Sequence, residues 1–390
     1  MTAASHPRTG PAGLAGLAGV LAVVGVAALA LLLGSGSSPA VVAPAPSPVP
    51  GAPHGVSQAT GSVVYGRYLR SSGAGDVVRG LVMTTTSGTS PRQLWGNEAC
   101  CASLGGRKVL FTRRTASGTQ DMLITTRPHA VVLRSLAVPF MMLGPGVLSP
   151  DGSRFAVWAT DRRHPRRGVL EIRVEGRWYR IGRFSSHPLR PLAFSPDLSE
   201  VLVFRPGPDP PAGDVGVVGI SSGRYQRITP PGMASWCCHF GSPASWSPGG
   251  RVAFAAFQHP STNNGLSAVF VTEQGSQDVR RVTDWGLWTT SAAWSPDGRQ
   301  IAFDTVNGSG GSHDLFLIDP DGGSPSLIAT PNDGSSCCAV WTPNGKALVY
   351  ETGISDTHMD LWTANVDGSG TFPLTTLHSH DLAYAVTPSP

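Results

Sequence analysis

Short apolar runs recur along this chain, and each is entered from a tight polar turn. The runs KVLF, RFAVW, EVLVF, RVAFAAF, QIAFD and ALVY begin at residues 108, 154, 200, 251, 300 and 347. A second apolar run follows, as in AVFVTE or DLFLID, and after it come a turn and a short strand such as SPSLIA. The repeats show almost no helical periodicity. The pattern therefore predicts an all-β chain of repeated units, each with four short strands.

The turn before each run is a version of the block W-S-P-D-G. Proline presets the backbone for a turn, and Asp-Gly tolerates the left-handed conformation that reverses the chain. Successive copies lie 45 to 52 residues apart, within the range of repeats that form one four-stranded propeller blade. The block occurs at Pro150, Pro196, Pro248, Pro296, Pro343 and Pro388, and Leu104 replaces the proline in an earlier copy.

The two ends of the repeat region complement each other. The unit SVVYGRYL, which begins at Ser62, lacks a first strand, whereas the final residues AYAVTPSP supply a first strand with nothing after it. We therefore expect a seven-bladed β-propeller of four-stranded blades, closed by the C-terminal strand, with six or eight blades as the alternatives. Such closure removes the exposed sheet edges that an open array would leave.

One segment carries a family resemblance. The stretch WSPDGRQIAFDTVNGSGGSHDLFLIDPDGGSPSLI, residues 294–328, resembles the repeat of TolB-like (WD-like repeat) β-propellers of the bacterial envelope. The resemblance extends over most of the chain after residue 57 and implies the propeller fold. It implies no particular activity, because the same blade serves binding scaffolds, peptidase domains and lyases.

The N-terminal region has a different composition. Residues 13–33 are 21 residues without a charge, close to the roughly 20 that cross a bilayer as a helix. We expect a cytoplasmic N-terminus at 1–12, a transmembrane anchor at 13–33, a Pro/Ser/Gly/Ala-rich linker at 34–57 and the propeller at 58–390. The propeller would then sit on the extracytoplasmic side of the cell membrane. The alternative is a signal sequence whose cleavage near Ala40 releases a secreted protein.

The connections between strands fall on two faces, because successive strands of a blade alternate in direction. Turns between the first and second and between the third and fourth strands are short, as in PDG, PNG and DPDGG, and we name their side the short-turn face. The opposite side, the long-loop face, has longer connections: LRSSGAGD, TDRRHPRRG, RPGPDPPAG, FQHPSTNNG, VNGSGGSHD and GISDTHMD. Long loops on a rigid scaffold are where binding usually resides.

All six cysteines form adjacent pairs, which we place on the long-loop face in the connections just before the innermost strands. The pairs are Cys100-Cys101, Cys237-Cys238 and Cys337-Cys338. Vicinal disulfides would act as rigid turns or as a ligand platform, although neighbouring Cα atoms about 3.8 Å apart make such a bond strained. The alternatives are bridges between pairs, capture of a soft metal and inert thiols. The C-x-x-C spacing of common zinc sites is absent.

Aromatic and histidine side chains accompany the cysteines on this face. Tryptophans there can stack on a sugar or peptide or can pack between blades, and histidines can bind a ligand or be ordinary loop residues. The candidate ligand-binding residues are Trp236, Trp285, Trp288, His187, His239, His378 and His380. Three other tryptophans occupy equivalent repeat positions and are expected in the core between blades: Trp246, Trp294 and Trp341.

These features favour a binding or scaffold module for a cell-envelope protein, peptide or glycan, without a cofactor or a metal. The formal net charge of +4 includes one arginine cluster, DRRHPRRG at 161–168, which we interpret as a solvated loop, so we expect no nucleic-acid partner. The string GISSG at 219–223 fits a turn between strands and not a nucleophile elbow. The alternatives are a hydrolase or lyase, possibly metal-assisted, and a redox sensor built on the cysteine pairs.

Overall fold

The structure is a computed structural model. It describes residues 58–70, 76–88, 91–95, 99–115, 118–125, 130–136, 146–160, 167–185, 187–207, 212–236, 242–258, 266–306, 313–330, 335–355, 358–375 and 380–387. All of these belong to the compact unit Pro48–Pro390. Their regular structure is β-strand throughout, as predicted. In this part of the chain no helix could span a membrane, and the predicted anchor at 13–33 lies outside it.

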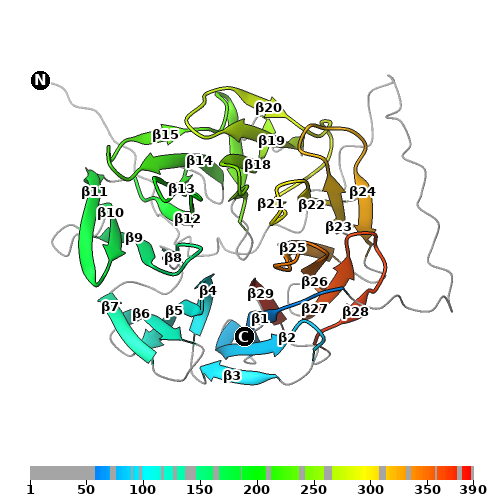
Figure 1. The fold of residues 1–390 in the computed structure, drawn as a ribbon, viewed down its shortest axis with the longest axis horizontal. Coiled ribbons are helices and arrows are strands. Elements are labelled where there is room, and N and C mark those ends of the chain that lie inside the picture. The colour runs from blue at the N-terminus through cyan, green and yellow to red at the C-terminus, as the bar shows by residue number, and fades with distance from the viewer. Residues whose placement is uncertain are drawn as a thin grey trace, which may run out of the picture. The chain divides into compact units, whose positions relative to one another are not determined.

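The strands pair antiparallel with their neighbours in sequence (Figure 1). The four-stranded sheets, each in spatial order, are β29 (His380–Thr387), β1 (Ser62–Arg70), β2 (Asp76–Thr85), β3 (Arg92–Trp95); β4 (Ala99–Gly105), β5 (Lys108–Thr115), β6 (Gly118–Thr125), β7 (Ala130–Leu136); β8 (Val147–Leu148), β9 (Arg154–Thr160), β10 (Gly168–Val174), β11 (Arg177–Ser185); β21 (Ala292–Trp294), β22 (Ile301–Val306), β23 (His313–Ile318), β24 (Ser326–Ala329); and β25 (Ser335–Trp341), β26 (Ala347–Ser355), β27 (His358–Asn365), β28 (Phe372–Pro373).

A larger, nine-stranded sheet consists of two such groups joined by one short strand. Its strands are β12 (Arg190–Phe194), β13 (Glu200–Pro206), β14 (Ala212–Gly219), β15 (Tyr225–Arg227), β16 (Met233–Trp236), β17 (Ala244–Trp246), β18 (Arg251–Gln258), β19 (Ser267–Glu273) and β20 (Val279–Arg281). The joining strand is β16, in which Trp236 pairs with Ala212 of β14 and Met233 pairs with Gln258 of β18.

The prediction that Trp236 lies in an irregular loop was therefore wrong. Strand β15 pairs with β14 only from Gly216 to Val218, and β17 pairs with β18 only from Val252 to Phe254. The other ends of β14 and β18 are left with open hydrogen-bonding edges. The segment MASW pairs with both edges, because unpaired backbone groups are costly when they are buried.

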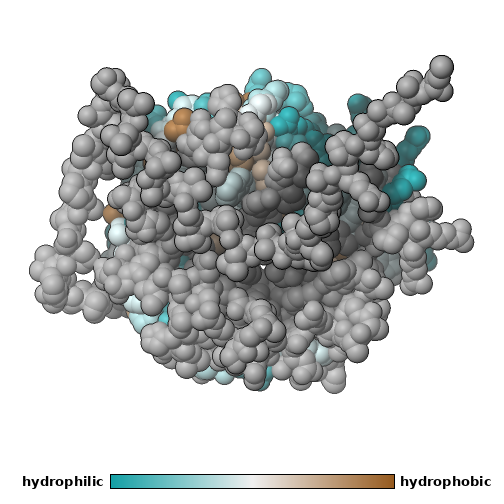
Figure 2. All heavy atoms as spheres, turned by 180° about the vertical axis from the view of Figure 1, so that it is seen from behind, coloured by the Kyte–Doolittle hydropathy of each residue, from teal (hydrophilic) through white to brown (hydrophobic). Residues whose placement is uncertain are grey.

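The innermost strands follow one another in a closed circle. Contacts run from β29 to β4, β8, β12, β17, β21, β25 and back to β29 (Figure 1). Seen from the opposite side, the described surface carries both hydrophilic and apolar atoms, with the apolar ones at the upper left (Figure 2). A circle of antiparallel sheets around a common centre is the arrangement predicted for a β-propeller.

The repeated block forms one recurrent hydrogen-bonded turn. The N–H of Gly152 donates to the carbonyl of Ser149 at 2.8 Å, and that of Gly298 donates to Ser295 at 2.9 Å. These glycines have φ of 68° and 72°, the left-handed conformation expected after the aspartate. In the copy FSPDL, Leu198 adopts φ 61°, which costs a residue with a side chain roughly 1–2 kcal/mol. The turn chemistry predicted for the block is confirmed.

The aspartates of these turns have depressed pKa values. The hydroxyl of Ser149 donates to Asp151 at 2.5 Å and, with bonds from Ser153, lowers the pKa of Asp151 to about 2. The hydroxyl of Ser195 does the same for Asp197, whose pKa is also about 2. Both carboxylates are therefore more easily ionised in the folded chain than in the unfolded chain, where their pKa is about 3.9.

We expect an acid-sensitive contribution to stability from these two turns. Lowered pKa values stabilise the fold above about pH 4 and the contribution is lost as the pH falls toward 2. The double variant Asp151→Asn/Asp197→Asn should be less stable than the natural chain at pH 7, by less than about 1 kcal/mol per turn because both groups face solvent. Urea unfolding at pH 7, 4 and 2.5 should show this difference shrinking, and a pH-independent difference would contradict the assignment.

The C-terminal strand closes the circle as predicted. Strand β29 pairs antiparallel with β1, from Ser62 opposite Thr387 to Tyr68 opposite His380. On its other side β1 pairs with β2, so β1 is an interior strand. Val63, Val64 and Tyr65 are 0%, 0% and 1% exposed. The first and last described strands therefore share one buried sheet.

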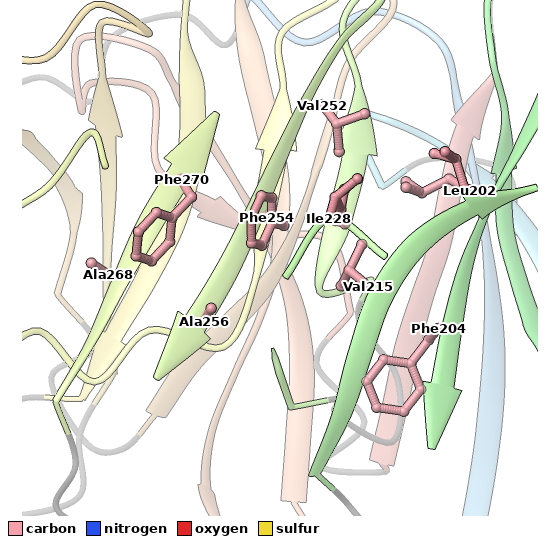
Figure 3. Close-up of a cluster of buried hydrophobic side chains, with 11 residues drawn as sticks. Leu202, Phe204, Val215, Ile228, Val252, Phe254, Ala256, Ala268 and Phe270 are labelled. Carbon is pink, nitrogen blue, oxygen red and sulfur yellow. The ribbon is translucent and has the colours of Figure 1, made fainter. Parts of the chain in front are cut away.

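Hydrophobic clusters lie between neighbouring sheets. Figure 3 shows the cluster between strands β12–β15 and β17–β20, in which the rings of Phe254 and Phe270 stack with centroids 5.5 Å apart. The tryptophans predicted to fill such spaces do so: Trp246 packs against this cluster, and Trp294 and Trp341 are 5% and 7% exposed in the two that follow. Packing between sheets thus continues around the circle.

The chain enters the described region on the short-turn face. The backbone N–H of Gln58 donates to Asn365 Oδ1 at 2.7 Å, and Asn344 Nδ2 donates to the carbonyl of Gln58 at 2.8 Å. Asn344 lies in the turn between β25 and β26, and Asn365 ends β27. Two side-chain amides of one sheet therefore hold the residue that precedes β1.

Candidate functional site

Two of the predicted tryptophans meet at the long-loop end of strand β18. The rings of Trp236 and Trp288 have centroids 6.3 Å apart at an interplanar angle of 76°. Trp236 also meets Phe257 of β18, with centroids 5.5 Å apart at 89°. Edge-to-face pairs of this kind are favourable for aromatic rings. We name Trp236, Phe257 and Trp288 the aromatic cluster.

The aromatic cluster reaches the surface beside an exposed leucine. Trp288 is 37% exposed and Leu266 is 38% exposed. An antiparallel bridge between Ser267 and Leu287 places Leu266 opposite Trp288. The apolar atoms at the upper left of Figure 2 lie on the side of the molecule that carries β18 to β21. Adjacent large apolar side chains at a surface mark an interaction site more often than scattered ones do.

A buried serine fixes the backbone on both sides of Trp288. Ser267 is 1% exposed, and its hydroxyl donates to the carbonyl of Leu287 at 2.5 Å. The same oxygen accepts the N–H of Thr289 at 2.6 Å. The residues before and after Trp288 are therefore bound to one side chain of β19.

A buried carboxylate fixes the next residues of the same loop. Asp304 of β22 is 0% exposed. Its Oδ1 accepts the N–H groups of Thr290 and Ser291 at 3.1 and 2.8 Å and the Ser291 hydroxyl at 2.7 Å, while its Oδ2 accepts the Thr290 hydroxyl at 2.7 Å. A buried charge requires such hydrogen bonds. Together with Ser267, Asp304 holds Trp288 on a rigid support.

Trp285 has a packing role and does not join the aromatic cluster. Its ring meets Phe270 edge-on with centroids 5.7 Å apart, and the guanidinium carbon of Arg281 lies 5.1 Å from its centre. It packs against the cluster of buried residues between β12 and β20. Of the two interpretations given for the loop tryptophans, packing between blades fits Trp285, whereas surface display fits Trp288.

Two of the cysteine pairs lie at equivalent positions inside innermost strands. Cys100 of β4 pairs with Thr112, and Cys337 of β25 pairs with Glu351. In each strand the next two residues face one residue of the neighbouring strand, which is a β-bulge. The sequence placed both pairs in the connections before these strands, so the structure moves them into the strands themselves.

The bulge in β25 gives one cysteine an unusual conformation. Cys338 has φ of 61° and is 6% exposed. The left-handed conformation is costly for a residue with a side chain, and bulges redirect side chains near functional sites. The pair Cys237-Cys238 lies outside the described residues. The vicinal disulfides expected at all three pairs stay a prediction.

The candidate histidines do not gather at the aromatic cluster in the described part of the chain. His187 is exposed in the connection between β11 and β12, where its N–H donates to Ser185 Oγ at 3.0 Å. His380 was expected in a loop, but it begins β29, opposite Tyr68. His239 and His378 lie outside the described residues. No three His, Cys, Asp or Glu residues that the structure describes could hold a metal together.

Sequence reasoning missed the residues that support Trp288. Asp304 is the last residue of the run QIAFD, where the equivalent residues of other repeats are Trp158, Phe204 and Ala255. A carboxylate at a buried strand position is a signal, because it requires several donors nearby. Ser267 carried no such signal, since a serine at the start of a strand is common.

The comparisons with known proteins bear on the fold. No family model matches the sequence, and no curated protein matches it significantly. The matching solved structures include an oligogalacturonate lyase from Vibrio parahaemolyticus, with 12% identity, coverage of 74% of this chain and 83% of that chain, and a TM-score of 0.58. An oligogalacturonate lyase in complex with manganese has 12% identity, coverage of 79% and 98%, and a TM-score of 0.57.

A third match is TolB from Acinetobacter baumannii, with 16% identity, coverage of 83% of each chain and a TM-score of 0.49. Identities this low show a shared fold and leave the activity open. The oligogalacturonate lyase structures agree with the circular order of the innermost strands found here. By its fold the chain is a β-propeller, and its sequence repeat is of the TolB-like kind.

Proposed function

We propose that this protein is a binding module of the cell envelope that recognises a protein, peptide or glycan through the aromatic cluster. The observation that carries the proposal is the display of Trp288, which is partly exposed yet supported by two buried polar side chains. A rigid aromatic residue loses little conformational freedom when a ligand binds. Residues of this type dominate the binding energy of many interfaces.

The proposed architecture has seven blades. The support is the circle of innermost strands, which gives one blade for each of β29, β4, β8, β12, β17, β21 and β25. The nine-stranded sheet then counts as two blades linked by β16. In this arrangement the aromatic cluster lies where blades four, five and six meet on the long-loop face.

We further propose that the propeller is tethered to the membrane on its extracytoplasmic side. The support is the uncharged segment 13–33 followed by the Pro-rich linker at 34–57. The chain enters the propeller at Gln58 on the short-turn face. The aromatic cluster, on the opposite face, is then directed away from the point of attachment.

Removal of the Trp288 side chain should abolish recognition. The full-length protein, in mild detergent, is titrated against arrays of peptides and envelope glycans, and the same array is repeated with Trp288→Ala. Loss of a central aromatic residue costs at least about 2 kcal/mol, so ligands should bind roughly 30-fold more weakly. Bound ligands are recovered and checked for cleavage, because a hydrolase or lyase would return them shortened.

Tyr179→Ala is the matched control. Tyr179 is 49% exposed in β11, so it is an aromatic residue of similar exposure at another place on the surface. The control should bind like the natural chain. Equal binding by Trp288→Ala, or equal losses in both variants, would contradict the site assignment.

A further inference from the structure

A pocket lies between the β8–β11 sheet and strands β12–β15, on blades that carry no part of the aromatic cluster except through β16. Its volume is about 160 Å³. The polar side chains that line it are Arg183, Ser185, His187, Arg205 and Tyr225. Among its described lining residues none is acidic, so the pocket presents a positive potential to a ligand.

Two glycines and a set of apolar side chains shape the pocket. Gly182 and Gly223 both have positive φ, and a Cβ on Gly223 would stand 2.6 Å from the Cα of Gly182. The backbones of two sheets therefore touch at this side of the pocket. Trp158, Leu170 and Val218, which also line it, are at most 4% exposed. The cavity thus has an apolar wall beside its basic groups.

Arg205 is held in place by two neighbours. Its guanidinium carbon lies 4.7 Å from the centre of the Tyr225 ring, and its Nη2 is 2.6 Å from Asp214 Oδ2. The other carboxylate oxygen of Asp214 is 2.8 Å from Arg227. One carboxylate therefore serves two guanidinium groups, which leaves a net positive charge in this set. A fixed planar guanidinium is well suited to binding a carboxylate.

Tyr225 adds a hydrogen-bond donor to the same pocket. Its hydroxyl is buried and has no hydrogen-bond partner among the described residues. Its ring lies against Gly216, where a Cβ would be 2.6 Å from the ring carbon Cε2. Burial raises the pKa of Tyr225 to about 12, so the hydroxyl keeps its proton at physiological pH. A ligand oxygen would satisfy this donor.

We propose that this pocket binds a small organic carboxylate with an apolar ring. The carboxylate interacts with Arg183, Arg205 and the Tyr225 hydroxyl, and the ring packs against the apolar wall that contains Trp158. The size agrees, since an apolar cavity of about 150 Å³ holds benzene. This inference concerns a site separate from the aromatic cluster, so neither proposal depends on the other.

Benzoate and benzyl alcohol are the probes, because they share the ring and differ in charge. Full-length protein in detergent is titrated with each by calorimetry and by saturation-transfer NMR, with empty micelles as the blank. We expect benzoate to bind at least tenfold more tightly than benzyl alcohol. Tyr225→Phe and Arg183→Gln should each weaken benzoate binding about tenfold, because each removes one hydrogen bond to a charged group.

The control is Arg224→Gln. Arg224 is an exposed arginine next to Tyr225 that does not line the pocket, so its loss should leave benzoate binding unchanged. Thermal unfolding of all variants shows that each is folded, and Tyr225→Phe keeps the ring that packs on Gly216. The proposal is overturned by benzoate that does not bind at 10 mM (roughly the weakest affinity of interest), by equal binding of both probes, or by an unchanged affinity in Tyr225→Phe and Arg183→Gln.

Discussion

Deletion of residues 380–390 should prevent this protein from accumulating as a folded monomer. The deletion removes β29 and turns β1 into an edge strand. Val63, Val64 and Tyr65, now fully buried, would become accessible, and burial of each such side chain is worth about 1.5–3 kcal/mol. A loss of about 5 kcal/mol is comparable with the whole stability of many domains. Size-exclusion chromatography and urea unfolding measure the outcome.

The control for this deletion removes residues 388–390 alone, beyond the end of β29, and should leave stability unchanged. Added peptide of the sequence HDLAYAVT, residues 380–387, should restore the folded monomer, because an extended peptide can add a strand to an open sheet edge. A deleted chain that unfolds at the natural urea midpoint would show that closure by β29 contributes little.

Replacement of Asp304 by alanine should cost about 3–5 kcal/mol of unfolding free energy, the range seen when one partner of a buried charged network is removed. The variant leaves the N–H and hydroxyl groups of Thr290 and Ser291 without their acceptor at a fully buried site. We also expect faster proteolysis near Trp288, because the loop that carries it loses one of its two supports. Urea unfolding and limited proteolysis of the full chain test both effects.

Two further variants separate this network from a general effect of lost charge. Asp304→Asn retains one oxygen acceptor and should cost roughly half as much as Asp304→Ala. Asp297→Ala, in the exposed turn before β22, removes a carboxylate of the same sheet and should cost less than about 1 kcal/mol. If Asp297→Ala were as damaging as Asp304→Ala, the hydrogen bonds of Asp304 would not be the cause.

Much of the fold could be predicted because its determinants are local. The turn at Ser149 or Ser295 uses a proline, an aspartate and a glycine within four residues, and each acts through its own backbone preference. Alternating apolar runs then give the strands. Closure by the final strand could be inferred from one unit that lacked a strand and one strand that lacked a unit.

The candidate site depended on contacts that a sequence repeat does not encode. Strand β16 forms because β15 and β17 are shorter than their partners, a consequence of pairing lengths in two different repeats. Trp236 thereby meets Phe257 and Trp288, which come from separate connections. Composition favoured tryptophan as a ligand-binding residue, but only the three-dimensional arrangement separates the displayed Trp288 from the packed Trp285.

The attachment of Gln58 has a mechanical consequence. A protein held by its N-terminus experiences any pulling force first at the point where the linker reaches the folded part. Here that point is bonded to Asn344 and Asn365, both in the sheet β25–β28, four residues before β1 begins at Ser62. These two amides bear the load before it reaches β1, so the seam between β1 and β29 is shielded from tension on the tether.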